Sequence, residues 1–292
     1  MVFAVTGANG FLGVHIIHHL LQKQHTVLAI KRASGSLNEF DQLKKSNYYA
    51  GIVYQNLEWS DCELYDTEGL HVIFKRADYV IHTAGLVSYK KRDLNHLIRI
   101  NKEYTANVVN MALQAGIKKI LYCSSISTLP KQKGQDLITE ANMWDNEAAY
   151  SNYGLSKYLG ECEIYRGIEE GLPGVIVNPG VILGYGDWNK GSNKLFKNAF
   201  KAFNFYSLGT TGFVGVEDVA RLCYKLCIGD FSNERYILVA ENKSYRDVAN
   251  TMARYFKKKP PSIAVKGIVY RLAYGIFSMA EVLNISGLLT RK

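Results

Sequence analysis

Cysteine and proline are both scarce in this sequence of 292 residues, which contains five of each. The cysteines are odd in number, widely scattered and never arranged as CxxC, at positions Cys62, Cys123, Cys162, Cys223 and Cys227. This pattern excludes a disulfide-rich secreted scaffold, and no neighbouring His or Cys cluster completes a zinc set beside Cys223 and Cys227. We therefore expect reduced, mostly buried thiols, no bound metal and a cytoplasmic protein.

Long apolar runs are lacking as well. No stretch of about 20 residues, the length that spans a bilayer, is free of charge. The sequence opens with strand-like residues 2–5 where a signal peptide would carry a basic and then an apolar segment. The closest apolar candidate, 272–290, contains Glu281 and Asn284. It predicts an amphipathic helix packed on the body of the protein, with association at a membrane surface as the lesser alternative. We expect no transmembrane segment.

Disorder and low complexity are excluded because 48% of the residues are hydrophobic and only 21% are charged. The charged residues have a basic excess, with 35 Lys and Arg against 26 Asp and Glu. Residues 1–150 hold 16 basic and 14 acidic residues, which leaves 19 and 12 for residues 151–292 and places +7 of the +9 there. No nucleic-acid motif accompanies the excess. It therefore favours an anionic small-molecule substrate, an acidic partner or solubility over nucleic acid.

Four lysines of the second half recur at spacings of four, three and four: Lys190, Lys194, Lys197 and Lys201. The spacing places them on one side of a helix that Ser192 could cap. This lysine stripe either attracts an anionic group of the substrate or is an ordinary solvated helix face, and the sequence favours the solvated face.

Strand-like and helix-like segments alternate through the first part of the chain. Strands are expected at 2–6, 25–30, 78–82, 119–123 and 174–178, and helices at 12–21, 94–115 and 153–170. Such alternation predicts right-handed βαβ units and an α/β fold with a doubly wound parallel sheet, the Rossmann architecture. After residue 180 the pattern loosens, with helices at 217–228 and 246–256. We expect one domain at 1–180 and a small, mainly helical lobe at 181–292, within which the chain can return to the sheet.

A glycine-rich turn follows the first strand. Gly7, Gly10 and Gly13 form a GxxGxxG pattern between this strand and the next helix. Such glycines let backbone N–H groups approach a pyrophosphate at the helix N-terminus, and the last one permits close packing of helix on sheet. The pattern predicts a nucleotide-binding site, against the alternative of a purely structural turn between strand and helix.

The end of the next strand indicates which nucleotide is bound. An acidic residue at this point would bind the ribose 2′-hydroxyl of NAD, but the sequence has Lys31, Arg32, Ala33 and Ser34. Cations and a hydroxyl group suit a 2′-phosphate. NADP is therefore the predicted cofactor, with NAD as the alternative, unless these residues are only a solvated strand end.

A catalytic pattern lies further along the chain. Tyr153 and Lys157 are four residues apart on a predicted helix, which places them side by side. A lysine ammonium near a phenol stabilises the phenolate and lowers its pKa, so Tyr153 could exchange a proton with a carbonyl or alcohol oxygen. Ser125 follows the strand 119–123, at the carboxyl end where a parallel sheet delivers catalytic groups. Its hydroxyl could hold the substrate oxygen.

Together these motifs resemble the extended short-chain dehydrogenase/reductase family, which includes the NAD-dependent epimerases and dehydratases, and within it the dihydroflavonol reductase-like branch. The matching segments follow the family's order and span three quarters of the chain: Thr6–Gly13, Asp61, His82–Gly85, Asn101, Ser124–Ser125, Tyr153 with Lys157, Asn178–Gly180 and Phe213–Ala220. The resemblance implies an NAD(P)-binding domain at 1–180 and a substrate-binding lobe at 181–292.

The resemblance also implies roles for individual residues. Ser125 would polarise the substrate oxygen, Tyr153 would be the general acid and base, and Lys157 would lower the pKa of Tyr153 and bind the nicotinamide ribose. Asn101 would support a proton relay, and Ser127 and Asn178 would face the substrate. The cofactor would be bound by Gly7, Asn9, Gly10, Phe11, Leu12, Gly13, Arg32, Ser34, Asp61, Cys62, Thr83, Ala84, Gly85, Tyr153, Lys157, Pro179 and Val181.

Three functions agree with these residues. The first is NAD(P)H-dependent reduction of a ketone or aldehyde, or the reverse oxidation of the alcohol. The second is a nucleotide-sugar epimerase that retains NAD, and the third is a non-catalytic dinucleotide-binding sensor or scaffold. The residues after Ser125 lack the acidic pair of the dehydratases, which argues against dehydration. The resemblance further implies a homodimer formed through two long helices.

Overall fold

The computed structural model describes residues 1–131, 134–145 and 150–265. The chain forms two compact units. The first consists of Met1–Asp187 and Phe213–Glu241, and the second of Trp188–Gly212 and the residues from Asn242 onward. The chain therefore leaves the first unit, returns to it and leaves it again.

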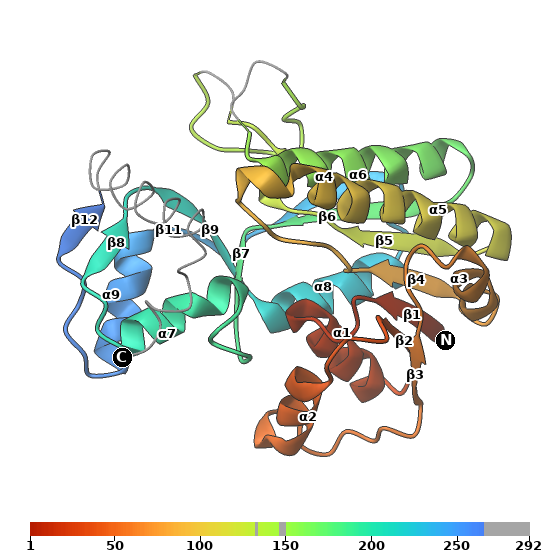
Figure 1. The fold of residues 1–292 in the computed structure, drawn as a ribbon, viewed down its shortest axis with the longest axis horizontal. Helices are drawn as coiled ribbons and strands as arrows, with labels where there is room; N and C mark the ends of the chain where they lie inside the picture. Colours follow the sequence, from red (N-terminus) through yellow and green to blue (C-terminus); the bar gives the residue numbers. More distant parts are fainter. Residues whose placement is uncertain (132–133, 146–149, 266–292) are drawn as a thin grey trace. The chain divides into compact units, whose positions relative to one another are not determined.

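A seven-stranded parallel sheet forms the centre of the first unit, with the order β10-β6-β5-β4-β1-β2-β3 (Figure 1). The strands are β1 (Val2–Thr6), β2 (Thr26–Lys31), β3 (Leu57–Asp61), β4 (Tyr79–His82), β5 (Lys119–Cys123), β6 (Gly174–Pro179) and β10 (Glu234–Leu238). The order reverses between β1 and β4, and ligands of open α/β sheets bind at such a switch point. The predicted doubly wound α/β fold is confirmed.

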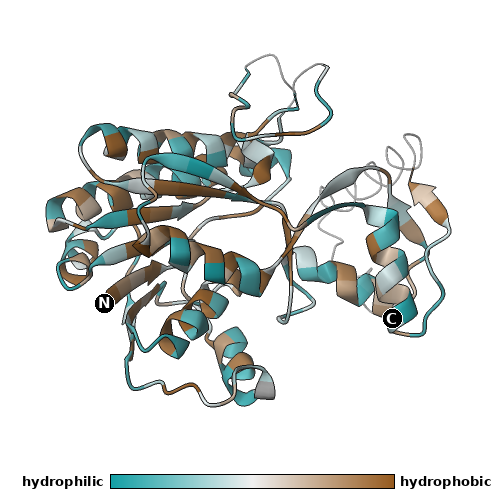
Figure 2. Ribbon diagram, turned by 180° about the vertical axis from the view of Figure 1, so that it is seen from behind, coloured by the Kyte–Doolittle hydropathy of each residue, from teal (hydrophilic) through white to brown (hydrophobic). Residues whose placement is uncertain are grey.

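Helices cover both faces of this sheet. One face carries α1, α2 and α8, and the other carries α3, α5 and α6. Their bounds are α1 (Phe11–Gln22), α2 (Asn38–Lys45), α3 (Thr67–Phe74), α5 (Tyr104–Ala115), α6 (Asn152–Glu169) and α8 (Val216–Ile228). The central strands β5 and β6 are buried along their whole length because helices cover both of their sides. Figure 2 shows hydrophobic residues concentrated along the strands, while polar and apolar residues alternate along the helices.

The helix predicted over 94–115 is interrupted. The structure has α4 (Leu94–Ile98), then a π-helical turn over Arg99–Glu103, then α5. Asn101 lies in the π-helical turn and is completely buried. Such turns often occur at functional sites, because the extra residue changes the direction of the side chains around it.

The second unit contains α7 (Lys194–Phe200), β8 (Phe205–Ser207), α9 (Tyr245–Tyr255) and β12 (Ile263–Val265), with β8 and β12 paired in parallel. Trp188 packs against Phe196, Phe200 and Phe256 at ring-centroid distances of 6.0, 5.8 and 5.5 Å. The N-cap of α7 is Asn193 and makes no side-chain capping bond, so the predicted cap at Ser192 is wrong.

The structure contains three further short strands: β7 (Val181–Leu183), β9 (Thr210–Gly215) and β11 (Glu241–Ser244). Strands β7 and β9 pair in parallel, with Val181 opposite Phe213. Within the described part of the chain no helix combines the length and apolarity needed to cross a membrane. The amphipathic helix predicted at 272–290 lies outside the described residues.

Buried neutral histidines link the stability of the first unit to pH. His15 lies between the Tyr49 hydroxyl (2.6 Å) and the Tyr185 carbonyl oxygen (2.8 Å), and burial lowers its pKa to about 4. His82 is completely buried and hydrogen-bonded to the hydroxyls of Thr6 and Thr105, and burial lowers its pKa to about 3. A histidine in the unfolded chain has a pKa near 6.5, so the unfolded state takes up protons first as the pH falls.

We expect the free energy of unfolding to decrease as the pH falls from 6.5 towards 4, by up to about 1.4 kcal/mol per pH unit for each such histidine. Urea unfolding at a series of pH values measures this slope. A His15→Gln variant, which has no titrating group at this position, should show a shallower slope between pH 6.5 and 5. An equally steep slope in that variant would contradict the assignment.

Candidate active site

The glycine turn after β1 brings two stretches of backbone into contact. Gly7 has φ = +65°, and a Cβ atom there would lie 2.7 Å from the Ala84 backbone. A Cβ atom at Gly13 would collide with the Gly7 carbonyl oxygen. Helix α1 starts at Phe11, after the N-cap residue Gly10, so its first amide groups open onto this cradle. A cradle that side chains would fill, at a helix N-terminus, fits the pyrophosphate of a dinucleotide.

The turn after β4 lies beside the glycine turn. The Thr83 hydroxyl donates to the Thr6 carbonyl oxygen at 2.7 Å, and the Thr6 hydroxyl and the His82 Nδ1 atom are 2.6 Å apart. The structure therefore brings Gly7, Thr83 and Ala84 together at the switch point between β1 and β4. His82 is completely buried and supports this turn through its contact with the Thr6 hydroxyl.

The two cations that were predicted to bind a phosphate, Lys31 and Arg32, differ in their surroundings at the end of β2. Lys31 forms an ion pair with Asp61, its partner in the β2–β3 register. Arg32 and Ser34 are exposed, and Arg32 forms no ion pair within the described residues. Arg32 is thus available as a cation for a ligand at this corner, whereas Asp61 is already neutralised by Lys31.

Two further predicted cofactor contacts flank the same corner. The Asn9 side chain donates to the Ser36 carbonyl oxygen at 3.0 Å and so ties the glycine turn to the loop after β2. Cys62 directly follows β3, and its amide donates to the Lys31 carbonyl oxygen at 2.9 Å. Its thiol is buried, and burial raises its pKa to about 11. Cys62 is therefore a neutral thiol directed at Asp66, and only its backbone contacts the end of β2.

The predicted catalytic groups converge beyond the end of β5. Ser125 is partly buried in the loop after β5, and its hydroxyl is near enough to the Tyr153 phenol, at the start of α6, to influence the pKa of the phenol. One turn later on α6, Lys157 is 3% exposed and its ammonium donates to the Cys123 carbonyl oxygen at 2.7 Å. The same ammonium lies 4.0 Å from the centroid of the Tyr122 ring. The structure therefore places Ser125, Tyr153 and Lys157 near one another beyond the end of β5.

The electrostatics of the three groups favour a protonated phenol. Burial raises the pKa of Tyr153 well above its ordinary value, and the Ser125 hydroxyl partly opposes this. This direction is opposite to the lowering predicted from the Tyr–Lys spacing, because burial is the largest influence on the phenol, while the Lys157 ammonium donates to the Cys123 carbonyl oxygen. Burial lowers the pKa of Lys157 to about 8. A phenol held in its protonated form is suited to donate a proton to a carbonyl oxygen.

Asn101 joins the π-helical turn to the loop after β4. Its side-chain oxygen accepts from the Leu86 amide at 2.8 Å, and its side-chain nitrogen donates to the Leu86 carbonyl oxygen and to the Ser156 hydroxyl, both at 2.9 Å. A Cβ atom at Gly85 would lie 3.2 Å from Asn101 and 3.7 Å from the Lys157 ammonium. Asn101 thus holds Gly85 against the helix that carries Tyr153 and Lys157.

Two further predicted residues, Ser127 and Asn178, contact the serine loop, and Pro179 and Val181 follow Asn178 in the sequence. The Ser127 hydroxyl donates to the Ser125 hydroxyl at 2.9 Å. Asn178, at the end of β6, is fully buried, and its side-chain nitrogen donates to the Ser125 carbonyl oxygen at 3.1 Å. Pro179 ends β6 opposite Leu238, and Val181 begins β7. The structure therefore places Asn178 behind the serine loop, where it contacts the backbone of Ser125.

The motifs did not indicate two charged residues that adjoin this loop. Glu161 on α6 is fully buried, and Arg235 on β10 forms an ion pair with it at 3.2 Å. Residues 153, 157 and 161 share one side of α6, so the spacing after Tyr153 and Lys157 was a usable signal for Glu161. No such signal marked Arg235, which reaches the site from a strand that follows much later in the sequence.

Comparisons with known proteins identify relatives. A sequence model of the family described as "NAD dependent epimerase/dehydratase family" matches residues 3–228. A putative dihydroflavonol 4-reductase of Synechocystis sp. is 29% identical over 182 residues, which cover 62% of this chain and 49% of that protein. Cinnamoyl-CoA reductase 1 of Petunia hybrida is 25% identical over 275 residues, which cover 89% of this chain and 78% of that protein. The first match thus spans about half the length of its relative.

Solved structures share the fold. A nucleoside-diphosphate-sugar epimerase from Pseudomonas aeruginosa superposes with a TM-score of 0.77 at 21% identity and covers 97% of this chain and 85% of that chain. At this identity the likeness concerns the fold alone.

The contact at Gly7 yields a prediction. A Gly7→Ala variant would combine a strained φ with a Cβ atom 2.7 Å from the Ala84 backbone. We expect the free energy of unfolding to fall by roughly 1–3 kcal/mol. We also expect the thermal shift produced by NADPH to disappear, because the cradle would be filled. Differential scanning fluorimetry with and without NADPH measures both effects.

Gly116→Ala is a matched control. Gly116 has φ = +71°, and a Cβ atom there would meet nothing within 4 Å, so only backbone strain is added. This variant should lose roughly 1 kcal/mol of stability and keep the NADPH shift. If Gly7→Ala also kept the full shift, the cradle would not be the cofactor site.

Proposed function

The chain belongs to the NAD-dependent epimerase/dehydratase family, and from this premise we propose that it reduces a ketone or aldehyde with NADPH, or oxidises the corresponding alcohol with NADP. The observation that carries the proposal is the convergence of Ser125, Tyr153 and Lys157 beyond the end of β5. The names of the relatives, dihydroflavonol 4-reductase and cinnamoyl-CoA reductase, support a reductase.

We assign the cofactor to the first unit. The Gly7–Gly13 cradle and the start of α1 would hold the pyrophosphate, and the corner formed by Arg32, Ser34, Asp61 and Cys62 would hold the adenosine end. The turn at Thr83–Gly85, with Lys157, Pro179 and Val181, would surround the nicotinamide end. When bound, the nicotinamide supplies the hydride for reduction or accepts it in oxidation.

The side chains of the chain itself would handle the oxygen atom of the substrate. Tyr153 donates the proton as negative charge develops on the carbonyl oxygen, and its raised pKa keeps the proton in place until then. Ser125 donates a hydrogen bond to the same oxygen and so stabilises the developing charge. Lys157 adds a nearby positive charge. Because burial lowers its pKa to about 8, this charge is largely present at neutral pH and decreases above pH 8.

An exposed aromatic side chain next to Tyr153 supports the proposal that a carbonyl substrate reaches Tyr153 on the side of the loop after β4. Tyr89 is 70% exposed, and its ring lies 5.8 Å from the Tyr153 ring in a T-shaped arrangement. Ser127, whose hydroxyl is bonded to that of Ser125, offers a polar group to a substrate on the other side. We propose that Asn178 acts indirectly, through the serine loop.

Tyr153→Phe tests the mechanism. Removing the phenolic oxygen takes away the proton donor and leaves the ring in place, so kcat for reduction of a carbonyl substrate should fall at least about 100-fold. The Kd for NADPH, measured by fluorescence titration, should change little. Steady-state oxidation of NADPH across a panel of ketones and aldehydes provides the rates.

Tyr158→Phe serves as the control because Tyr158 lies on the same helix and stacks on Trp144 at 4.1 Å, away from Ser125. It should retain kcat. Full turnover in Tyr153→Phe would rule out the mechanism. If the unchanged protein binds NADPH firmly but turns over no substrate of the panel, a sensor or scaffold is favoured.

Arg32 tests the choice of cofactor. We expect NADPH to raise the melting temperature more than NADH, because Arg32 is exposed and available to bind a 2′-phosphate. Arg32→Ala should weaken NADP binding about 10- to 100-fold, the strength of a charge-assisted hydrogen bond, and leave NAD binding nearly unchanged. Arg76→Ala, which removes an exposed arginine paired with Glu58, is the control.

A second candidate is a nucleotide-sugar epimerase, since the family description names epimerases. Such an enzyme retains its cofactor between turnovers. NAD released from the purified protein on denaturation, with no exchange against added NADPH, would support an epimerase and contradict the NADPH-dependent reductase.

A further inference from the structure

A buried carboxylate stands behind the catalytic serine. Glu161 on α6 has no exposed surface, so its carboxyl group lies in the interior of the first unit. One of its oxygens, Oε1, accepts hydrogen bonds from Ser124 Oγ at 2.5 Å, Thr128 Oγ1 at 2.8 Å and Asn178 Nδ2 at 2.7 Å. Three donor groups converge on this one oxygen, so Glu161 is the hub of the hydrogen bonds around the serine loop.

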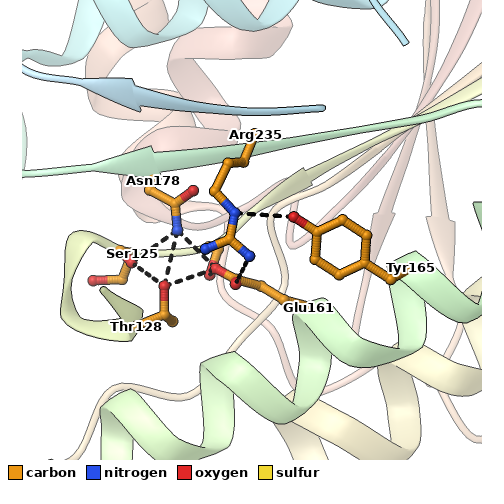
Figure 3. A network of polar contacts seen from close by, with 7 residues as sticks. Ser125, Thr128, Glu161, Tyr165, Asn178 and Arg235 are labelled. Carbon is orange, nitrogen blue, oxygen red and sulfur yellow. Dashed lines mark hydrogen bonds and ion pairs between the residues drawn. The ribbon is translucent and has the colours of Figure 1, made fainter. Parts of the chain in front are cut away.

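A guanidinium group completes this hub from another element. Arg235 Nη2 lies 3.2 Å from the second oxygen, Oε2, and its side chain is only 13% exposed. Its Nε atom donates to the Tyr165 hydroxyl at 2.9 Å, which fixes the plane of the guanidinium group. Figure 3 shows Arg235 reaching from β10 to Glu161 on α6, with Tyr165 one turn further along the helix. The ion pair therefore ties the edge strand of the sheet to the catalytic helix.

The same donors hold the backbone of Ser125. The Asn178 amide nitrogen lies 3.1 Å from the Ser125 carbonyl oxygen, so its two hydrogens can bridge Glu161 and Ser125. The Thr128 hydroxyl lies 3.0 Å from that carbonyl oxygen (Figure 3), so its single proton can be donated either to this oxygen or to Glu161 Oε1. Ser124, the residue before Ser125, is anchored through its own side chain. The conformation of the loop on both sides of Ser125 thus depends on one carboxylate.

We propose that Glu161 and Arg235 form a positioning pair that sets the direction of the Ser125 hydroxyl. The proposal rests on the proposed function, in which this hydroxyl binds the substrate oxygen. Neither member of the pair touches the reacting atoms. Glu161 orients the donors that hold the serine loop, and Arg235 holds the Glu161 carboxyl group so that it points at them.

A second ion pair on the same helix provides a comparison, because its residues lie on that helix and at its C-cap and it is more exposed. Arg166 bonds to Glu170 at 2.8 Å, and the Glu170 side chain is 49% exposed. This pair stabilises the helix surface and reaches none of the predicted site residues. A pair that served stability alone would need no burial, because a buried charge pair is rarely more stabilising than apolar groups of the same volume. The buried pair instead fixes the geometry of a loop.

Glu161→Gln is the primary test. Glutamine keeps the shape and one acceptor oxygen, but it loses the charge and presents an amide N–H group either to Arg235 or to the three donors. If the serine hydroxyl shifts, kcat for carbonyl reduction should fall about 10- to 100-fold. The Kd for NADPH should change little, because none of the hydrogen bonds of Glu161 within the described residues reaches the Gly7–Gly13 cradle. Glu170→Gln, the matched control on α6, should retain kcat.

A double-mutant cycle separates positioning from general damage. In a Ser125→Ala background the hydroxyl to be positioned is gone, so adding Glu161→Gln should cause little further loss of kcat. If the two losses multiply instead, Glu161 acts elsewhere and the proposal is overturned, as it is if Glu161→Gln retains full kcat. If Ser125→Ala itself retains full kcat, the proposed function fails, which is a different result.

Arg235→Lys provides a second test of the proposal in case Glu161→Gln does not fold. It keeps a positive charge near Glu161 but lacks the planar fork that bonds to Tyr165 and Glu161 together. It should lower kcat about 3- to 10-fold, with a melting temperature close to that of the unchanged protein, and this loss should vanish in the Ser125→Ala background. A loss that persists in that background contradicts the positioning role even if Glu161→Gln does not fold.

Discussion

Close approach of two backbone turns at the switch point of the sheet is the constraint on which the site depends. Gly7 touches Ala84, and Gly13 touches Gly7, at distances that admit no side chain. Because β1 and β4 are parallel neighbours, their following turns must leave the sheet at the same edge. Helix α1 can start there only if its first turn lies against the strand end. The cradle, the helix N-terminus and the loop that Asn101 holds are all consequences of this contact.

Buried polar groups then fix the loops around the cradle. Asn101 satisfies both backbone groups of Leu86 and also bonds to Ser156, and Glu161 gathers the donors around Ser125. An unpaired buried polar group is costly, so the loop conformations that make these hydrogen bonds have few alternatives. The lysine on which the mechanism relies is placed by the same rule, since Lys157 is buried and bonded to the Cys123 carbonyl oxygen.

Much of this could be predicted from local patterns. The apolar runs indicated the central strands, and the glycine spacing and the Tyr153–Lys157 spacing indicated the two halves of the site. Strand β3 was not predicted, because its sequence LEWSD is half-exposed at the sheet edge and carries no apolar run. The π-helical turn was not predicted either, because a shift in backbone hydrogen bonding leaves no trace in hydrophobic spacing. The direction of the Tyr153 pKa depended on the burial of the phenol, which the spacing of Tyr153 and Lys157 does not specify.

The sequence by itself determined the alternation of strands and helices, the glycine turn, and the presence of a serine, a tyrosine and a lysine in the right order. These features are local, since each depends on residues within a few positions of one another. Tertiary structure alone decided that Lys31 is taken by Asp61 while Arg32 stays available, that Asn178 faces the serine loop, and that Arg235 meets Glu161. These pairings join residues far apart in the chain, and they follow from the strand order and register that bring β2 beside β3 and β10 beside β6.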